Sequence, residues 1–487
     1  MIVVGGGLAG LSCAIALADA GCRVRLFEKR PHLGGRAASY TLPDGAEIDN
    51  CQHVTMGCCT NLADFYARVG ASGKIRFFDH MLFADREGRV SRIGPSRLPP
   101  PFHLAPAFAR FRSLGVGDKL GIARALAEII RGGGKPREGA ERNMLEWLRS
   151  RGQTPAAIER FWRVVLVSAL DEELDRAQAQ YGIDVFYKAF LATRGGYRLG
   201  VPAVPLGELY AGCQAALAAR GGEIRTRARV ARVRIEAGSV AGLVFDDGSE
   251  AVADAYVVAV PHDAFLELLP ADLVEREPVF AALRQLRTSP ITGIHLWFDR
   301  EVTSEPFWAL VGLESQWVFN KSLLLHPRVE AESERGPSRA APGTGGAAAP
   351  SKPARDGQYL QVVISASYDL VPRSRQEIVE RVRRELELVL PAARSAELLK
   401  ATVVKETSAT FSPAPGVDRW RPPAQSPIRQ LFLAGDWTRT GWPATMEGAV
   451  RSGYSAAEAV LSFTWQRREF LQPDLPPEGL VHLWVRS

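Results

Sequence analysis

Residues 1–10, MIVVGGGLAG, place three glycines at the spacing Gly-x-Gly-x-x-Gly between an apolar, β-branched start and an Ala- and Leu-rich stretch at 8–20. The pattern predicts a buried strand, a tight turn and a helix. Gly5 would allow the turn, Gly7 would let the backbone approach a pyrophosphate, and Gly10 would let the helix pack closely on the strand. The N-terminus of such a helix carries a partial positive charge that favours phosphate groups. These residues therefore predict a Rossmann-like α/β fold that binds a dinucleotide.

An acidic residue ends the second strand of this unit. Val24, Leu26 and Phe27 predict that strand, and Glu28 follows it directly. A carboxylate at this point accepts hydrogen bonds from ribose hydroxyls and repels a 2′-phosphate. The glycine motif alone is weak evidence, but the flanking strand, helix and acidic residue favour a nucleotide site over a glycine-rich turn without a ligand.

The composition is that of a globular protein with more than one unit. With 487 residues, 46% hydrophobic and 23% charged, the chain is long enough for two or three domains. The 60 basic and 54 acidic residues leave a net charge of +6, without a run of five basic residues, so we expect no nucleic-acid partner. The six cysteines form no CxxC pair and no Cys/His set at zinc spacing, so no metal site is predicted.

Neither an export signal nor a membrane-spanning segment is predicted. The chain starts directly with the apolar strand, and no stretch of about 18 consecutive apolar residues occurs. We therefore expect a cytoplasmic protein, attached at most peripherally to the inner face of a membrane. The apolar stretch 98–130, with its interspersed Arg and Lys, is a candidate for that contact. A helix that covers a substrate pocket or packs in a dimer would give the same pattern.

Further segments carry a family resemblance. The segment 28–36, EKRPHLGGR, resembles the ExxxxxGGR signature of the flavoprotein amine oxidase and phytoene desaturase superfamily. The segment 431–437, LFLAGDW, is similar to the second FAD motif of that superfamily, and 445–453 is similar to the helix whose N-terminus faces the flavin. The segment 229–233, RVARV, resembles the strand that binds adenine. The resemblance spans the whole chain and implies that the protein binds FAD.

The resemblance also implies an interleaved architecture: a Rossmann-like FAD-binding domain of the amine oxidase type, an α+β substrate domain and a helical region. The expected boundaries give the FAD-binding domain 1–60, 201–265 and 426–463, the helical substrate or membrane-facing region 61–200, the substrate domain 266–425, and a tail 464–487. Residues 329–358, rich in Gly, Ala, Pro and Ser, predict a disordered insertion.

The resemblance assigns the cofactor contacts residue by residue. The residues expected to hold FAD are Gly5, Gly7, Leu8, Ala9, Gly10, Glu28, Lys29, Gly34, Gly35, Arg36, Val230, Gly435, Asp436, Thr445 and Met446. Covalent attachment would require a reactive side chain near the flavin, and the C-terminal motif offers no cysteine. We therefore expect FAD to be held non-covalently.

Two stretches, 433–453 and 49–57, are similar to the squalene-associated hydroxysqualene dehydroxylase branch of the superfamily. That branch removes an allylic hydroxyl from hydroxysqualene reductively and forms squalene for hopanoid or sterol synthesis. The resemblance therefore implies an FAD-dependent oxidoreductase that acts on a long, hydrophobic isoprenoid. Carotenoid or phytoene desaturases, amine oxidases and a non-catalytic FAD-binding scaffold are the alternatives.

Loss of an allylic hydroxyl leaves a delocalised cation, so the site must supply a proton to the oxygen and apolar walls that exclude water. His53 is the first candidate for the proton donor, because its intrinsic pKa suits proton transfer near neutrality. Asp49 would orient the loop of His53, and a structural histidine bonded to backbone is the simpler alternative. Asp171, Glu172 and Glu173 are further candidate acids, although such a cluster is more often a solvated helix face. The walls would come from aromatic residues of the helical region: Phe102, Phe108, Phe111, Phe161, Trp162, Phe186, Tyr187 and Phe190.

Overall fold

The computed structural model describes residues 1–135, 142–325 and 357–484. The first of its two large sheets is parallel. The strand order is β10-β2-β1-β14-β20, and every neighbouring pair is parallel. The strands are β10 (Glu223–Arg225), β2 (Arg25–Phe27), β1 (Ile2–Val4), β14 (Tyr256–Val258) and β20 (Leu431–Leu433). Segments from the start, middle and end of the chain therefore meet in one sheet, which confirms the predicted Rossmann-like α/β domain.

Both faces of this sheet are covered, as in most parallel sheets. One face packs against α1 (Leu8–Asp19), α2 (Thr60–Arg68), α9 (Ala211–Ala218) and α15 (Met446–Phe463). The other face packs against α10 (His262–Glu267), α11 (Ala271–Arg276), α12 (Pro278–Ala282) and an antiparallel sheet of β11 (Val230–Glu236), β12 (Ser239–Phe245) and β13 (Glu250–Ala251). Alternate side chains of β1 point to the two faces of the sheet. Val3 packs in the core on the side of α1, and Ile2 and Val4 pack in the core on the side of α10.

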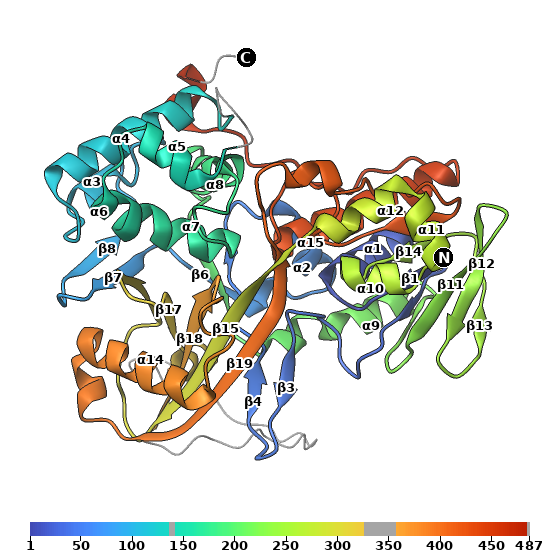
Figure 1. Ribbon diagram of the computed structural model, residues 1–487, viewed down its shortest axis with the longest axis horizontal. Coiled ribbons are helices and arrows are strands. Elements are labelled where there is room, and N and C mark those ends of the chain that lie inside the picture. Colours follow the sequence, from blue (N-terminus) through green and yellow to red (C-terminus); the bar gives the residue numbers. More distant parts are fainter. Residues whose placement is uncertain (136–141, 326–356, 485–487) are drawn as a thin grey trace, which may run out of the picture.

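The second large sheet is mixed and has seven strands in the order β19-β15-β18-β17-β16-β7-β8. The strands are β19 (Leu398–Phe411), β15 (Thr288–Phe298), β18 (Gln358–Ser365), β17 (Trp317–Asn320), β16 (Phe307–Val311), β7 (Met81–Asp85) and β8 (Val90–Ile93). Helix α14 (Arg375–Val389) covers one face, and a helical lobe covers the other. The long strands β15 and β19 run from this sheet toward the parallel sheet and connect the two parts of the molecule (Figure 1).

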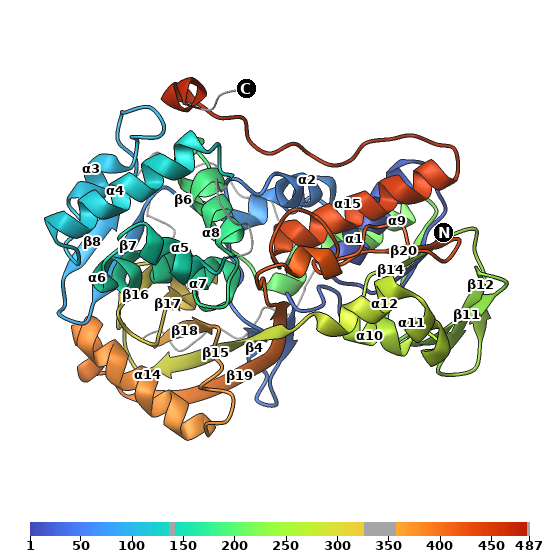
Figure 2. The same ribbon diagram turned by 45° about the horizontal axis from the view of Figure 1, so that its top comes forward.

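The helical lobe lies on the second sheet, across the molecule from most of the parallel sheet (Figure 2). Its helices are α3 (Ala105–Ala109), α4 (Val116–Arg131), α5 (Met144–Ser150), α6 (Pro155–Ala157), α7 (Arg163–Leu170) and α8 (Ala179–Val185), with π-helical turns η2 (Ile158–Trp162) and η3 (Phe186–Leu191). The interior of the lobe is aromatic. The Trp162 ring lies edge-on to those of Phe161 and Phe186, at centroid distances of 5.3 and 4.6 Å.

The region 61–200 is less helical than the sequence predicts. It contributes β7 and β8 to the second sheet, and it contains β6 (Ile75–Phe78), which pairs with β9 (Leu199–Pro202). Strand β9 also pairs with β5 (Thr55–Met56). Local periodicity does not reveal these strands, because β6 and β7 pair with strands that lie far along the chain, β9 and β16.

Smaller elements lie outside the two large sheets and the helical lobe. A hairpin of β3 (Ser39–Thr41) and β4 (Glu47–Asp49) leads to the His53 loop, and α13 (Lys321–Leu325) follows β17. The predicted tail 464–487 is packed on the body as far as it is described, because Phe470 and Val481 are buried. The insertion predicted at 329–358 lies outside the described residues except for its last two. In the described part of the chain, no helix combines the length and apolarity needed to cross a bilayer.

Candidate active site

A cavity of about 810 Å³ joins the parallel sheet to the helical lobe. One end is lined by the glycine turn after β1 and by the segments that follow β2 and β20. The other end is lined by aromatic side chains of the lobe, including Phe161 and Phe186. Every residue predicted to hold FAD lines this cavity except Gly10, which lies behind the turn. The structure therefore places the predicted cofactor and substrate regions in one continuous space.

The glycine turn has the shape of a pyrophosphate cradle. Gly5 has a φ of 109°, which favours glycine, and a Cβ there would lie 2.5 Å from the Ala259 carbonyl oxygen. A Cβ on Gly10 would lie 1.9 Å from the Gly5 carbonyl oxygen. A Cβ on Gly7 would meet nothing nearer than 3.8 Å, so the space in front of Gly7 is open. None of the described side chains caps α1 at Gly7, which leaves the helix N-terminus to bind an anion.

The segment after β2 packs directly against this turn. Gly34 has a φ of 103°, and its backbone N–H donates to the Gly6 carbonyl oxygen at 2.8 Å. Glu28 is buried, and its carboxylate accepts hydrogen bonds from the backbone N–H groups of Gly6, at 2.6 Å, and Arg30, at 2.7 Å. Both glycine loops and the acidic residue therefore meet at one end of the cavity. Their arrangement fits a dinucleotide.

An ion pair links the N-terminal and C-terminal FAD motifs. Arg36 Nη2 lies 2.7 Å from Asp436 Oδ2, and both residues line the cavity. Arg36 Nη1 also donates to the Ala409 carbonyl oxygen, near the end of β19, at 2.6 Å. Arg36 therefore fixes the two motifs relative to each other and to a strand of the substrate domain.

Arg421, which no sequence motif identified, holds the C-terminal loop in place. It is fully buried, and its Nη2 donates to the backbone carbonyl oxygens of Asp436, Thr438 and Trp442 at 3.0, 2.6 and 2.9 Å. Its Nη1 pairs with Asp418 at 2.9 Å. The loop that carries the second FAD motif is thus organised around one guanidinium. Sequence alone offers no signal for this role, because the three carbonyl oxygens converge only in the folded loop.

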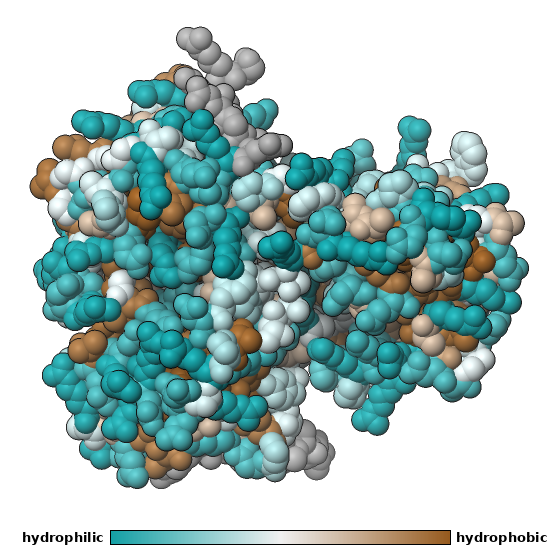
Figure 3. Space-filling model, viewed as in Figure 1, coloured by the Kyte–Doolittle hydropathy of each residue, from teal (hydrophilic) through white to brown (hydrophobic). Residues whose placement is uncertain are grey.

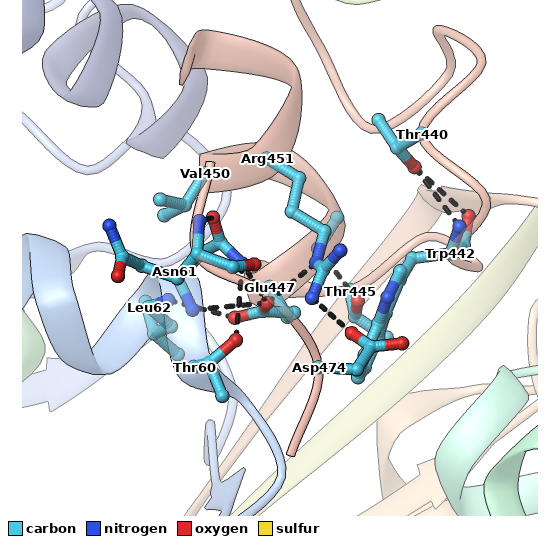
Figure 4. Close-up of polar contacts among 12 residues, drawn as sticks. Thr60, Asn61, Leu62, Thr440, Trp442, Thr445, Glu447, Val450, Arg451 and Asp474 are labelled. Carbon is cyan, nitrogen blue, oxygen red and sulfur yellow. Dashed lines mark hydrogen bonds and ion pairs between the residues drawn. The ribbon is translucent and has the colours of Figure 1, made fainter. Parts of the chain in front are cut away.

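Helix α15 begins at the cavity, and Glu447 anchors its first turn. The Glu447 carboxylate accepts hydrogen bonds from the backbone N–H groups of Asn61, at 3.1 Å, and Leu62, at 2.8 Å, at the start of α2. It also pairs with Arg451 Nε at 2.7 Å, and Figure 4 shows these contacts between the two helices. Thr445 caps α15 and lines the cavity. The buried carboxylate therefore fixes the helix N-terminus that is predicted to face the flavin.

Trp442 presents an unused hydrogen-bond donor at this end of the site. The residue is buried and lines the cavity, and its Nε1 has no partner among the described residues. Lys188 Nζ and the Arg451 guanidinium carbon lie 4.7 and 4.8 Å from its ring centroid. A buried indole N–H usually has a partner, so a bound molecule that accepts this hydrogen bond fits the site.

His53 lines the cavity, whereas Asp49 does not. His53 Nδ1 lies 3.0 Å from the Cys51 carbonyl oxygen, and a carbonyl only accepts, so Nδ1 carries the proton. Burial lowers the pKa of His53, which leaves the ring neutral and Nε2 an acceptor. His53 stays a predicted catalytic residue, and its protonation state favours accepting a hydrogen bond.

Asp49 belongs to a buried network behind His53. Its carboxylate pairs with Lys321 Nζ at 2.7 Å and accepts a hydrogen bond from Ser39 Oγ at 2.7 Å. Burial raises the pKa of Asp49, but Lys321 and the hydrogen bonds outweigh this effect and lower the pKa. Lys321 also donates to Gln52 Oε1 at 3.0 Å, one residue before His53. Asp49 is therefore placed to position the His53 loop.

The acidic cluster 171–173 is largely buried and is not the solvated helix face that such clusters usually form. Asp171 and Glu172 are 4% and 1% exposed, and Glu173 pairs with Arg163 at 2.5 Å. Asp171 lines the cavity, whereas Glu172 accepts a hydrogen bond from Ser412 Oγ away from it. The charge pattern does not reveal this burial, because the covering strands come from distant parts of the sequence.

Most of the predicted aromatic wall is present. Of the predicted residues, six line the cavity: Phe102, Phe108, Phe111, Phe161, Phe186 and Phe190. Tyr181, which the sequence analysis did not name, also lines it. Trp162 and Tyr187, which the sequence also suggested, lie outside the lining. Trp484, from the predicted tail, joins the wall beside Phe102, with a centroid distance of 6.3 Å.

Comparisons with known proteins give the family and the fold of the chain. The family described as flavin containing amine oxidoreductase matches residues 8–461. The zeta-carotene desaturase of Synechocystis sp. is 28% identical over 480 residues, which cover 94% of this chain and 96% of the relative. The 15-cis-phytoene desaturase of Solanum lycopersicum is 28% identical over 478 residues, which cover 95% of this chain and 77% of the relative.

The crystal structure of an oxidoreductase from Methanosarcina mazei superposes with a TM-score of 0.70 at 18% identity and covers 95% of this chain and 99% of its own. This likeness confirms the fold. The family match includes the segments 28–36 and 431–437 and confirms the prediction that the protein binds FAD. The chain belongs to the family of flavin-containing amine oxidoreductases.

Proposed function

We propose that this FAD-dependent oxidoreductase removes the hydroxyl of hydroxysqualene reductively and so forms squalene, a precursor of hopanoids or sterols. The observation that carries the proposal is the continuous cavity, whose far arm is lined by Phe108, Phe161 and Phe190. A long hydrocarbon suits this arm, because burial stabilises it by about 25 cal/mol for each Å² of apolar surface. The stretches 433–453 and 49–57, with their resemblance to the hydroxysqualene dehydroxylase branch, favour this substrate among the isoprenoids.

Reduced FAD supplies a hydride to an electron-poor carbon, and the chain supplies the rest of the chemistry. The glycine turn and the N-termini of α1 and α15 would hold the dinucleotide. The aromatic arm holds the hydrocarbon, excludes water that would capture a carbocation, and offers ring faces that stabilise positive charge. His53, with Nε2 as an acceptor, orients the substrate hydroxyl, and Asp49 positions the His53 loop through Lys321.

Carotenoid desaturation is the second candidate, and the relatives favour it. The two curated relatives at 28% identity are named as desaturases of zeta-carotene and phytoene. Desaturation removes a hydride and a proton from a hydrocarbon, so it uses the same apolar arm in the opposite redox direction. It needs no proton for a departing hydroxyl.

The product of anaerobic turnover separates these functions. Enzyme with chemically reduced FAD and hydroxysqualene should yield squalene, identified by mass spectrometry. Parallel reactions with oxidised enzyme should test phytoene and a set of amines. A desaturated product from phytoene, with no squalene from hydroxysqualene, would select the second candidate, and oxidation of an amine would contradict both.

We also propose that the helical lobe binds peripherally to the cytoplasmic face of a membrane. Phe102 is 40% exposed and lines the cavity, and Leu98, Val116 and Leu120 of the same stretch are exposed. Apolar side chains interrupt the hydrophilic surface over the lobe in Figure 3. A substrate that is insoluble in water would then enter the arm from lipid.

Liposome flotation tests this contact. The variant with Leu98, Val116 and Leu120 changed to Ser should float less than the wild type with anionic vesicles. Leu388→Ser and Leu399→Ser provide the control, because both leucines are exposed on the substrate domain, away from the lobe. Equal flotation of the two variants would contradict the proposal.

A further inference from the structure

Asp171 lies where the substrate arm meets the FAD motifs. It follows α7 in the left-handed conformation, with a φ of 52°, and it lines the cavity although it is only 4% exposed. Asp adopts this conformation more readily than most residues other than glycine. The left-handed residue ends the helix and brings the carboxyl to the strands β18 and β19.

The two carboxyl oxygens of Asp171 have different partners. Oδ1 accepts a hydrogen bond from the Ala366 backbone N–H at 2.8 Å, and Oδ2 lies 2.8 Å from Thr410 Oγ1. A backbone N–H can only donate, so Oδ1 must stay an acceptor. A hydroxyl can donate or accept, so Oδ2 is the oxygen that can carry a proton.

The surroundings raise the pKa of this carboxyl. Burial has the largest effect and raises the pKa of Asp171 well above its ordinary range, and the carboxylate of Glu172 acts in the same direction. The two hydrogen bonds and the charge of Arg36 act in the opposite direction without cancelling it. Cys51, which also faces this part of the cavity, stays a neutral thiol, because burial raises its pKa to about 12. The surroundings of Asp171 therefore favour the protonated form of its carboxyl.

Short contacts connect Asp171 to the FAD motifs. Thr410 follows Ala409, whose carbonyl oxygen accepts a hydrogen bond from Arg36, and Arg36 pairs with Asp436 of the C-terminal motif. Thr410, Arg36 and Asp436 all line the cavity. A substrate carbon held at the cofactor end of the arm would therefore lie beside this carboxyl.

We propose that Asp171 is the catalytic acid that protonates the departing hydroxyl, an inference that rests on the dehydroxylation proposed above. The allylic C–O bond breaks, its electron pair stays with the oxygen, and Asp171 Oδ2 gives its proton to that oxygen, which leaves as water. The carbon would gain the hydride that bound, reduced FAD would supply, so the substrate would gain two electrons and the cofactor would lose two. One proton from solvent restores the acid.

Two other carboxyls provide matched controls. Glu172 is equally buried, but it does not line the cavity. Asp184 lines the cavity, and burial raises its pKa to about 6, but the charge of Lys188 and a hydrogen bond from Gln180 Nε2 at 2.8 Å favour its ionised form. Glu172 therefore tests burial away from the cavity, and Asp184 tests a second carboxyl at the cavity.

The test compares Asp171→Asn with Glu172→Gln and Asp184→Asn in the FAD-loaded enzyme. Asn keeps the acceptor oxygen for Ala366 and tolerates the left-handed conformation, so FAD absorbance should be unchanged. With hydroxysqualene and reduced FAD, Asp171→Asn should lose about a hundredfold or more of single-turnover rate. The acetate ester of the same alcohol leaves without a proton from the enzyme, so its turnover should be nearly unaffected. Infrared spectra at neutral pH should contain a protonated-carboxyl C=O band that Asp171→Asn lacks.

Each outcome decides one point. Wild type that makes no squalene would overturn the proposed function and this role together. Wild type that makes squalene, beside an Asp171→Asn enzyme that is equally fast, would overturn the role alone. Equal losses with the alcohol and the ester would show a structural effect and also reject the acid. Loss of activity in Asp184→Asn instead would assign the proton to Asp184.

Discussion

Gly7→Ala should separate cofactor binding from folding. A Cβ at this position would meet no protein atom nearer than 3.8 Å, so the cofactor-free protein has room for it. Position 7 is the N-cap of α1, and alanine is a poorer N-cap than glycine. This difference lowers the unfolding free energy by less than about 1 kcal/mol. The reduced entropy of the unfolded chain offsets this by about 0.4–1 kcal/mol. The unfolding free energy of the cofactor-free protein should therefore stay within about 1 kcal/mol of the wild-type value.

The same methyl group should weaken FAD binding. It would project into the open space in front of Gly7, where the pyrophosphate approaches the backbone at the start of α1. Loss of one hydrogen bond to a charged group costs about 1.5–3 kcal/mol. This loss corresponds to an affinity lower by about ten- to a hundredfold. Titration of cofactor-free protein with FAD, followed by flavin fluorescence, measures the affinity, and urea unfolding of the same preparation measures stability.

Two other glycines make the comparison specific. Gly10→Ala should destabilise the cofactor-free protein, because its Cβ would lie 1.9 Å from the Gly5 carbonyl oxygen and backbone atoms would have to move. Gly117→Ala, in α4, meets no atom within 4 Å and should leave FAD affinity unchanged. The reasoning is refuted if Gly7→Ala binds FAD as tightly as the wild type, or if it loses stability as Gly10→Ala does.

Three further predictions concern buried ionisable groups. Lys321→Met should lower the unfolding free energy by about 3–5 kcal/mol, because it leaves the buried Asp49 carboxylate without its cation; urea unfolding should show part of this loss restored by adding Asp49→Asn. Glu447→Ala should cost about 3 kcal/mol, since two buried N–H groups of α2 lose their acceptor, whereas Glu380→Ala on the surface of α14 should change the urea midpoint little. Burial lowers the pKa of His295 from 6.5 to about 4, so as the pH falls the unfolded chain takes up a proton before the folded one. Stability should therefore drop by about 3 kcal/mol between pH 6.5 and 4, and His295→Gln should flatten that part of the profile; an unchanged slope would reject this origin.

The cofactor half of the site could be predicted from sequence because its geometry is local. The turn from Gly5 to Gly10 and the loop from Glu28 to Arg36 are short segments whose backbone conformation depends on their own glycines. The strands that bring them together follow the parallel order that this type of fold imposes. The predicted motif residues other than Gly10 therefore lie together at this end of the cavity.

The substrate half could not be predicted in the same way, because burial there depends on distant segments. The cluster that begins at Asp171 has the composition of a solvated helix face, but residues after β18 and on β19 bond to it and bury it. Arg421 and Lys321 look like ordinary surface cations in the sequence, and both are buried among polar partners. No local pattern distinguishes a cation of this kind from an exposed one.

Desolvation links these buried groups to the direction of the reaction. An allylic cation reacts with any water within reach, so a site that forms one must be dry, and the proton for the leaving oxygen must then come from a fixed group. The same desolvation raises the pKa of Asp171 and lowers that of His53, so it favours a proton on the carboxyl and a neutral imidazole. A desaturase needs the reverse, a base that has already lost its proton. The infrared band of Asp171 in the oxidised and reduced enzyme therefore bears directly on the redox direction: a protonated carboxyl in both states favours removal of a hydroxyl, and an ionised one favours removal of hydrogen.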